Sequence, residues 1–160
     1  MSATGLDVFD KTLQTTNIWL DEIMDQIGPA RHTAWHVLGA TLHALRDRLT
    51  IDQAVHLGAQ LPLLVRGLYY DQWRPASMPS RERSLDEFLA HVGDGLRDTR
   101  PVNVREAVET VFRVLAKHIS KGQADKVAGE LPAEIRALWP SDAQRAAGPQ
   151  RGAAELERAS

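Results

Sequence analysis

The chain carries the same short pattern twice, and this repetition limits the folds that it can form. Residues 59–73 read AQLPLLVRGLYYDQW and residues 129–142 read GELPAEIRALWPSD. Residues 33–69 align without a gap with residues 103–139, and the identical pairs are Leu45/Leu115, Gln53/Gln123, Ala54/Ala124, Leu61/Leu131, Pro62/Pro132, Arg66/Arg136 and Leu68/Leu138. Similarity at one fixed spacing is typical of a duplicated supersecondary unit. The sequence therefore predicts two tandem pseudo-repeats.

Apolar residues recur in both copies at spacings of three and four, which is typical of amphipathic helices. The N-terminal segment has one such stripe: Phe9, Leu13, Thr16, Leu20, Ile23 and Ile27. The two copies have equivalent stripes: Leu38, Leu42, Leu45 and Leu49, then Val108, Phe112, Leu115 and Ile119. We expect all three stripes to face the core. The predicted fold class is all-α, with three to four helices per repeat packed into one bundle-like domain.

Three short motifs mark where helices should begin. Each has a hydroxyl residue followed three positions later by Gln or Glu: Thr50 with Gln53, Ser84 with Glu87, and Ser120 with Gln123. In such a capping box the hydroxyl accepts from the third helical N–H, and the longer side chain reaches back to the N–H of the cap residue. We expect a helix to start at each position.

The Leu-Pro pairs at Pro62 and Pro132 predict a break between two short helices. Proline has no N–H for an intrahelical bond, but the first turn of a helix does not need that donor. Arg66 and Arg136 follow four residues later and point away from the neighbouring apolar stripe. Because both copies have this arginine, we expect it to be structural and to reach a carboxylate or a helix C-terminus in its own repeat.

The length of 160 residues is ordinary for one domain. We expect a single all-helical domain over residues 1–140, with repeat one at about 6–70 and repeat two at about 84–140. Residues 71–83 form the linker between them and carry no helix signal. Residues 141–160 contain few large apolar residues, and their Gly, Pro and mixed charges predict a flexible tail.

The linker holds the candidate binding residues Trp73, Arg74, Arg81 and Arg83. One interpretation is a small basic platform for phosphate or an acidic partner, with Trp73 available for stacking. The alternative is structural, and it is the one that we favour from the sequence. In that interpretation Trp73 fills the edge of the core, and the arginines pair with carboxylates: Asp71, Asp86 and Glu87.

Composition and missing motifs argue against several classes of function. The net charge of −2 gives no overall field toward nucleic acid, and the absence of cysteine removes thiol chemistry. No glycine-rich phosphate loop, G-x-S-x-G or H-E-x-x-H motif is present, so no catalytic residue is assigned. His32, His36 and His43 share a helix face, but that face lies opposite the apolar stripe. We therefore expect a solvated or self-associating face there, with no metal and no cofactor.

A longer match carries a family resemblance. Residues 42–75, LHALRDRLTIDQAVHLGAQLPLLVRGLYYDQWRP, are followed by EFLAHV, and together they resemble the bacterial family named domain of unknown function 2267. The segments TLQTTNIWLDEIMDQIG and QADKVAGELPAEIRALWP are similar to the same family, so the resemblance covers roughly residues 6–140. It implies a small, soluble, all-helical bacterial protein of paired repeats. It implies no reaction.

Three functional hypotheses follow. The favoured one is a non-enzymatic protein-interaction or regulatory module with a protein partner or as a homodimer. The first alternative is a nucleic-acid or anionic-ligand binder that uses the Arg-rich linker, although nucleic acid is not the partner that we expect. The second is a small-ligand or metal-dependent enzyme with a site between the repeats. We expect a cytoplasmic protein, since no secretion signal or membrane span is apparent.

Overall fold

The computed structural model describes residues 2–141 and 144, and within them all regular structure is helical. The elements, in chain order, are α1 (Asp7–Ile27), α2 (Arg31–Arg48), α3 (Ile51–Gln60), α4 (Leu63–Tyr70), the 3-10 turn η1 (Pro75–Ser77), α5 (Leu85–Asp94), α6 (Val104–His118), α7 (Lys121–Glu130) and α8 (Ala133–Arg136). The all-α prediction is confirmed. The predicted tail lies outside the described residues, apart from positions 141 and 144. Among the described helices, none combines the length and apolar character needed to cross a bilayer.

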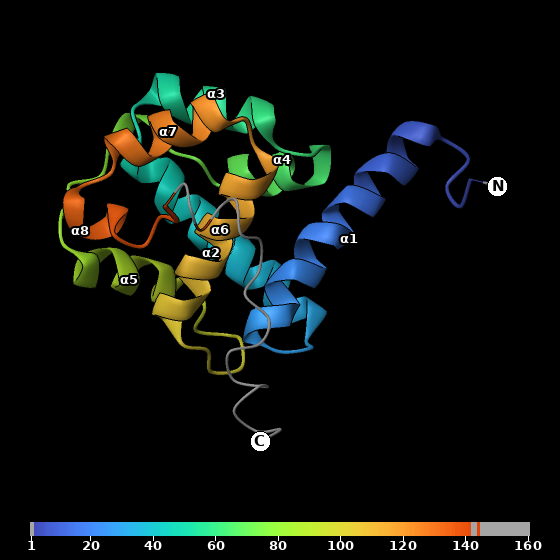
Figure 1. The fold of residues 1–160 in the computed structure, drawn as a ribbon, viewed down its shortest axis with the longest axis horizontal. Helices are drawn as coiled ribbons and strands as arrows, with labels where there is room; N and C mark the ends of the chain where they lie inside the picture. Colours follow the sequence, from blue (N-terminus) through green and yellow to red (C-terminus); the bar gives the residue numbers. More distant parts are fainter. Residues whose placement is uncertain (1, 142–143, 145–160) are drawn as a thin grey trace.

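Helices α2 and α6 pack against each other at the centre of the molecule (Figure 1). The residues of their apolar stripes are all buried: Leu38, Leu42, Leu45 and Leu49 on α2, and Val108, Phe112, Leu115 and Ile119 on α6. Helices α1 and α5 each pack on both central helices, and α3 lies beside α7 (Figure 1). These two predicted stripes therefore form the core, whose burial is the main favourable term in folding.

The stripe predicted for the first helix is buried only in its second half. Leu20 and Ile23 are buried where α1 packs on α2 and α6, but Phe9 is 48% exposed and Leu13 is 42% exposed. The prediction that the whole stripe faces the core is therefore wrong at its N-terminal end. The reason is length: α1 is longer than the body that it packs against, so its first turns project beyond that body (Figure 1).

The three predicted helix starts are confirmed, because the side chains of Thr50, Ser84 and Ser120 each accept a hydrogen bond from the backbone N–H three residues later. The second half of the capping-box prediction is wrong. In these three boxes, all of them within the described residues, the longer side chain makes no bond to the N–H of its own cap.

Instead, α3 and α7 cap each other. The N–H of Thr50 donates to Oε2 of Glu130 at 3.2 Å, and the N–H of Ser120 donates to Oε1 of Gln60 at 3.1 Å. Glu130 and Gln60 are the last residues of α7 and α3, so the two helices run antiparallel. Each cap N–H therefore receives its acceptor from the other half of the chain, a partner that local sequence does not specify.

The Leu-Pro segments behave alike in both halves of the chain. Pro62 and Pro132 directly precede α4 and α8, as the missing N–H predicts. Arg66 Nε donates to the carbonyl of Gly58 and Arg136 Nε donates to that of Ala128, both at 2.9 Å. Each arginine also donates from Nη2 to two further carbonyls at the end of the preceding helix: Ala59 and Leu61 for Arg66, and Gly129 and Leu131 for Arg136. These bonds satisfy carbonyls that a helix end leaves unpaired.

Candidate functional site

Trp73 lies at the edge of the core. Its half-buried side chain packs against the core cluster, and its ring centroid lies 5.4 Å from that of Tyr70. The indole N–H donates to the sulfur of Met78. Trp73 is thus held between Tyr70 of α4 and Met78 of the linker, with part of its side chain exposed to solvent.

The linker arginines are free of carboxylates. Arg74, Arg81 and Arg83 are exposed, and within the described part of the chain their guanidiniums have no hydrogen-bond or ion-pair partner. The expected pairing with Asp71, Asp86 and Glu87 is therefore wrong. The linker does not need it, because other groups hold its backbone.

Two contacts with α2 anchor the linker. The N–H of Ser80 donates to the carbonyl of Asp47 at 2.6 Å, and Nη1 of Arg48 donates to the carbonyl of Ser80 at 2.7 Å. The 3-10 turn η1 lies in the same segment, where the sequence shows no helix signal. Gln72 precedes it with a φ of 57°, a left-handed conformation that is uncommon for residues other than glycine. The linker is therefore an ordered turn rather than an extended strap.

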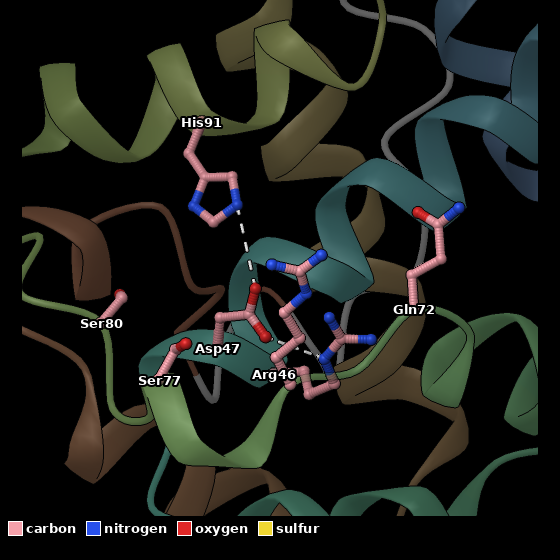
Figure 2. A pocket seen from close by; sticks show the side chains of 7 residues that line it. Arg46, Asp47, Gln72, Ser77, Ser80 and His91 are labelled. Carbon is pink, nitrogen blue, oxygen red and sulfur yellow. Dashed lines mark hydrogen bonds and ion pairs between the residues drawn. The ribbon is translucent and has the colours of Figure 1, made fainter.

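A cavity of about 280 Å³ opens between this linker, the C-terminal end of α2 and α5 (Figure 2). Its lining residues are Arg46, Asp47, Gln72, Arg74, Ser77, Ser80 and His91. Only Arg74 was among the binding residues predicted from the sequence. Trp73 lines a neighbouring hollow together with Gln72 and Arg74, whereas Arg81 and Arg83 line neither.

Arg46 is the most deeply placed charge in this cavity, with only 3% of its surface exposed. Its Nε donates to Oδ1 of Asp47 at 2.9 Å, and its Nη1 donates to the carbonyls of Tyr69 and Asp71 at 2.6 and 3.0 Å. Both carbonyls lie at the C-terminal end of α4, where a cation interacts favourably with the helix dipole. The described residues offer no acceptor to Nη2.

Asp47 connects Arg46 with the opposite wall. Its Oδ2 lies 3.9 Å from Nε2 of His91 on α5 (Figure 2). Nδ1 of His91 lies 2.7 Å from Oε1 of Glu82. The hydroxyl of Ser80 donates to the other oxygen of Glu82 at 3.3 Å. The carboxylates near the cavity are therefore already occupied by Arg46, His91 and Ser80.

One sequence signal could have identified Arg46. In the ungapped alignment of residues 33–69 with 103–139, Arg46 corresponds to Ala116, which is also buried. An arginine at a buried position where the equivalent residue is alanine is not required by helix packing alone. His91, Ser77 and Ser80 carry no comparable signal, because the tertiary contacts of the linker bring them together.

The predicted histidine face is only partly solvated. His32 and His36 contact each other, with their Nε2 atoms 3.1 Å apart. His43 is half-buried, and its Nε2 lies 2.7 Å from the carbonyl of Leu68, so the prediction of a wholly solvated face is wrong. Helix α4 packs on this side of α2 and partly covers His43, while His32 stays exposed. Within the described residues, no three His, Asp or Glu side chains are grouped so that they could hold a metal.

The position of His43 predicts a pH dependence of stability. Burial lowers the pKa of His43 below its ordinary value, while the bond to Leu68 opposes this shift. The unfolded chain therefore binds a proton at a higher pH than the folded chain, and the stabilisation present above the unfolded pKa of about 6.5 is lost as the pH falls through the folded pKa. The neighbours Arg46, Asp47 and Asp71 also act on this group.

We expect the free energy of unfolding to fall more steeply in wild type than in His43→Gln as the pH is lowered from 7 to 5. Urea unfolding followed by circular dichroism at several pH values would measure both slopes. His32→Gln serves as the matched control, because His32 is exposed and on the same helix. Equal slopes for wild type and His43→Gln would show that His43 does not titrate differently in the two states.

The family model for the uncharacterized conserved proteins named DUF2267 matches residues 16–138. The chain belongs to this family. No curated protein matches the chain. The DUF2267 match includes the cavity and the linker, but it begins at Thr16, after the first turns of α1.

These first turns carry a second candidate surface. Leu6, Phe9 and Leu13 are exposed and continue, at spacings of three and four, the stripe that is buried further along α1. We call these three residues the α1 seam. Val8 of α1 and Leu63 and Leu64 at the start of α4 add further exposed apolar surface. The three residues of the α1 seam lie outside the DUF2267 match, whereas Leu63 and Leu64 lie inside it.

An open groove of about 440 Å³ runs beside the seam, between α1 and the turn from α3 to α4. Val8, Thr12 and Trp19 line one wall, and Pro62 and Leu63 line the other. The N–H of Leu64 donates to the hydroxyl of Thr12 at 3.2 Å, which holds α4 against α1. The groove is therefore formed by ordered helices.

Proposed function

We propose that this DUF2267 protein is a non-enzymatic protein-interaction or regulatory module that works as a homodimer through the α1 seam. The observation that supports this most directly is the exposure of Leu6, Phe9 and Leu13 on one helix face. A cluster of large apolar side chains on a surface is typical of a protein–protein contact. The partner proposed is a second copy of the chain.

The spacing of the seam supports a second copy. Leu6, Phe9, Leu13, Thr16, Leu20, Ile23 and Ile27 alternate spacings of three and four, which is the pattern of a coiled-coil seam. The later residues pack inside the molecule, and the first three have no such cover. In a symmetric dimer each copy supplies the same surface, so one contact covers both exposed seams. Residues 6–15 span about 15 Å of helix, which predicts a dimer of modest affinity.

We also propose that the domain is built from two pseudo-repeats. In that case the first turns of α1, which carry the seam, are an extension that the second repeat does not have. Helix α1 would correspond to α5, which packs on the same two central helices. Trp19 aligns with Phe88, so Thr16 corresponds to Leu85, the first residue of α5. Residues 7–15 of α1 therefore have no helical counterpart in the second half, and they include the exposed seam residues Phe9 and Leu13.

Contacts between helices further support the pseudo-repeats. On α1, Glu22 accepts from Nζ of Lys117 at 2.6 Å and lies 2.8 Å from Nε2 of His118, both near the end of α6. The corresponding contact places His91 of α5 beside Asp47 of α2. Glu22 aligns with His91 and Lys117 aligns with Asp47, so equivalent positions contact each other in both halves, with the acidic and the basic residue exchanged.

The homodimer is tested with two substitutions of equal exposure. Phe9 and Ile51 are each 48% exposed, and Ile51 lies at the start of α3, away from the seam. In sedimentation equilibrium we expect wild type and Ile51→Asp to dimerise, and Phe9→Asp to dissociate at least tenfold more readily because a charge would be buried in the contact. All three should keep the same melting behaviour at high dilution.

Several outcomes would contradict the homodimer. A wild type that stays monomeric at millimolar concentration would rule it out. Equal dimerisation of Phe9→Asp and wild type would place the contact elsewhere. If the wild type is monomeric and a different protein binds it through Phe9, the seam serves that partner instead of a second copy.

A further inference from the structure

The cavity beside the linker has an arrangement of charges that the proposed dimer does not use. Its lining contains two guanidiniums, Arg46 and Arg74, and one carboxylate, Asp47, so the charges do not balance. Asp47 already accepts from Nε of Arg46 and lies beside His91. Arg74 has no partner among the described residues. A positive excess therefore faces the cavity.

Arg46 is only partly satisfied by the protein. Three of its five N–H groups are used, by Asp47 and by the carbonyls of Tyr69 and Asp71. The other two, on Nη2, have no acceptor among the described residues, and Nη2 is not one of the buried unpaired polar atoms, so it is accessible from the cavity. Nη2 can therefore donate to a ligand oxygen in the cavity without giving up a bond within the protein. The pair with Asp47 fixes one edge of the guanidinium and leaves the other edge available.

The remaining lining supplies neutral hydrogen-bonding groups. Ser77 and Ser80 contribute hydroxyls from the linker, and Gln72 contributes an amide from a residue with a φ of 57° (Figure 2). Backbone strain of this kind, which costs of order 1–3 kcal/mol, is found most often at functional sites. Two arginines with several neutral donors around a small cavity are the chemistry that recognises a tetrahedral oxyanion.

We propose that this cavity binds the phosphate group of a small phosphate ester. Nη2 of Arg46 and the guanidinium of Arg74 bind phosphate oxygens, and the hydroxyl of Ser77 donates to a remaining one. Asp47 is a positioning residue, because it holds the guanidinium of Arg46 by its Nε edge. The volume of about 280 Å³ admits the phosphate and a small organic group, and it excludes a large ligand.

The design of the test separates binding from folding. Arg46 also holds the end of α4, so its removal affects stability as well as binding. Arg74 is exposed and holds nothing, which makes Arg74→Ala the informative variant. Arg81→Ala is the matched control, since Arg81 is an exposed linker arginine of the same charge that does not line the cavity. Thermal unfolding of each variant, monitored in parallel, verifies that it is folded.

The experiment is isothermal titration of the full chain at low ionic strength with two probes, inorganic phosphate and phenyl phosphate. We expect saturable binding at one site per chain, a loss of roughly tenfold or more in affinity for Arg74→Ala, and no change for Arg81→Ala. Tighter binding of phenyl phosphate than of inorganic phosphate would identify an ester as the ligand, and the reverse order would overturn the ester assignment. No saturable binding by wild type would overturn the site. Equal weakening by Arg74→Ala and Arg81→Ala would also overturn it, since that result describes a diffuse basic linker.

Discussion

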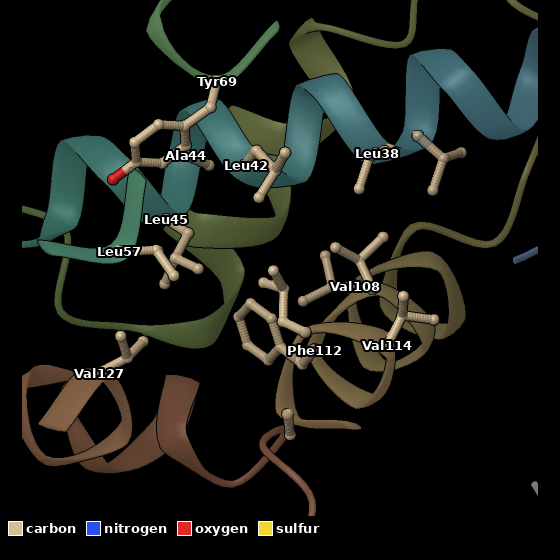
Figure 3. Packing of buried hydrophobic residues seen from close by; sticks show 14 of the residues in the cluster. Leu38, Leu42, Ala44, Leu45, Leu57, Tyr69, Val108, Phe112, Val114 and Val127 are labelled. Carbon is tan, nitrogen blue, oxygen red and sulfur yellow. The ribbon is translucent and has the colours of Figure 1, made fainter. Parts of the chain in front are cut away.

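Replacing Phe112 by alanine should lower the free energy of unfolding by about 3–5 kcal/mol. Phe112 is fully buried on α6, and it faces the stripe of α2 that contains Leu42 and Leu45 (Figure 3). Its ring centroid lies 5.1 Å from that of Trp139 and 6.1 Å from that of Phe88. Alanine would leave a cavity among side chains from both halves of the chain, and such a cavity relaxes only in part. Urea unfolding followed by circular dichroism would measure the change.

Two further variants serve as controls for the Phe112→Ala prediction. Phe112→Leu keeps most of the volume and should cost much less than Phe112→Ala. Leu63→Ala removes a side chain that is about half exposed on α4, and it should change stability by less than 1 kcal/mol. A loss below 1 kcal/mol for Phe112→Ala would mean that α2 and α6 do not share one core.

Replacing Trp19 by alanine should destabilise the protein by a similar amount, about 3–5 kcal/mol. Trp19 is 1% exposed, and its ring stacks on His118 of α6 with centroids 5.2 Å apart. It belongs to the half of α1 that packs on the body, so its loss loosens the helix that carries the seam. We expect Trp19→Ala to weaken dimerisation as well as stability, whereas Phe9→Asp should affect dimerisation alone.

The experiment on Trp19 must be made at one fixed protein concentration, because dimerisation contributes to apparent stability. Trp73→Ala is the comparison. Because Trp73 is only half-buried at the core edge, this substitution should lower the free energy of unfolding distinctly less than Trp19→Ala. A loss for Trp73→Ala as large as that for Trp19→Ala would show that the linker turn is as important to the fold as the α1 anchor. Unchanged stability of Trp19→Ala would contradict the packing of α1 on α6.

Much of the helical framework could be predicted from local patterns. The apolar spacing of Leu38 to Leu49 and of Val108 to Ile119 predicts the two central stripes, and both are buried. The hydroxyls of Thr50, Ser84 and Ser120 predict three helix starts that the structure confirms. These predictions succeed because they depend on periodicity and on hydrogen bonds within three residues.

The candidate site could be predicted much less well. Of the cavity lining, Arg74 was expected in a binding role, whereas Arg46, Gln72, Ser77, Ser80 and His91 were not. The expected pairing of the linker arginines with carboxylates was wrong, because the backbone of Ser80 and not the arginines holds the linker to α2. A carboxylate nearby in sequence is not a partner unless the fold turns both side chains toward the same point.

The amino-acid sequence by itself determined which segments are helical, where several of them begin, and which faces of α2 and α6 are apolar. These properties follow from side-chain spacing and local hydrogen bonding, which act over three or four residues. Only the tertiary structure decided that Phe9 and Leu13 stay exposed, that Glu130 and Gln60 cap the opposite helices, and that Arg46 and His91 line one cavity. Each of these depends on which helix ends meet in space, and that is set by packing between segments far apart in the chain.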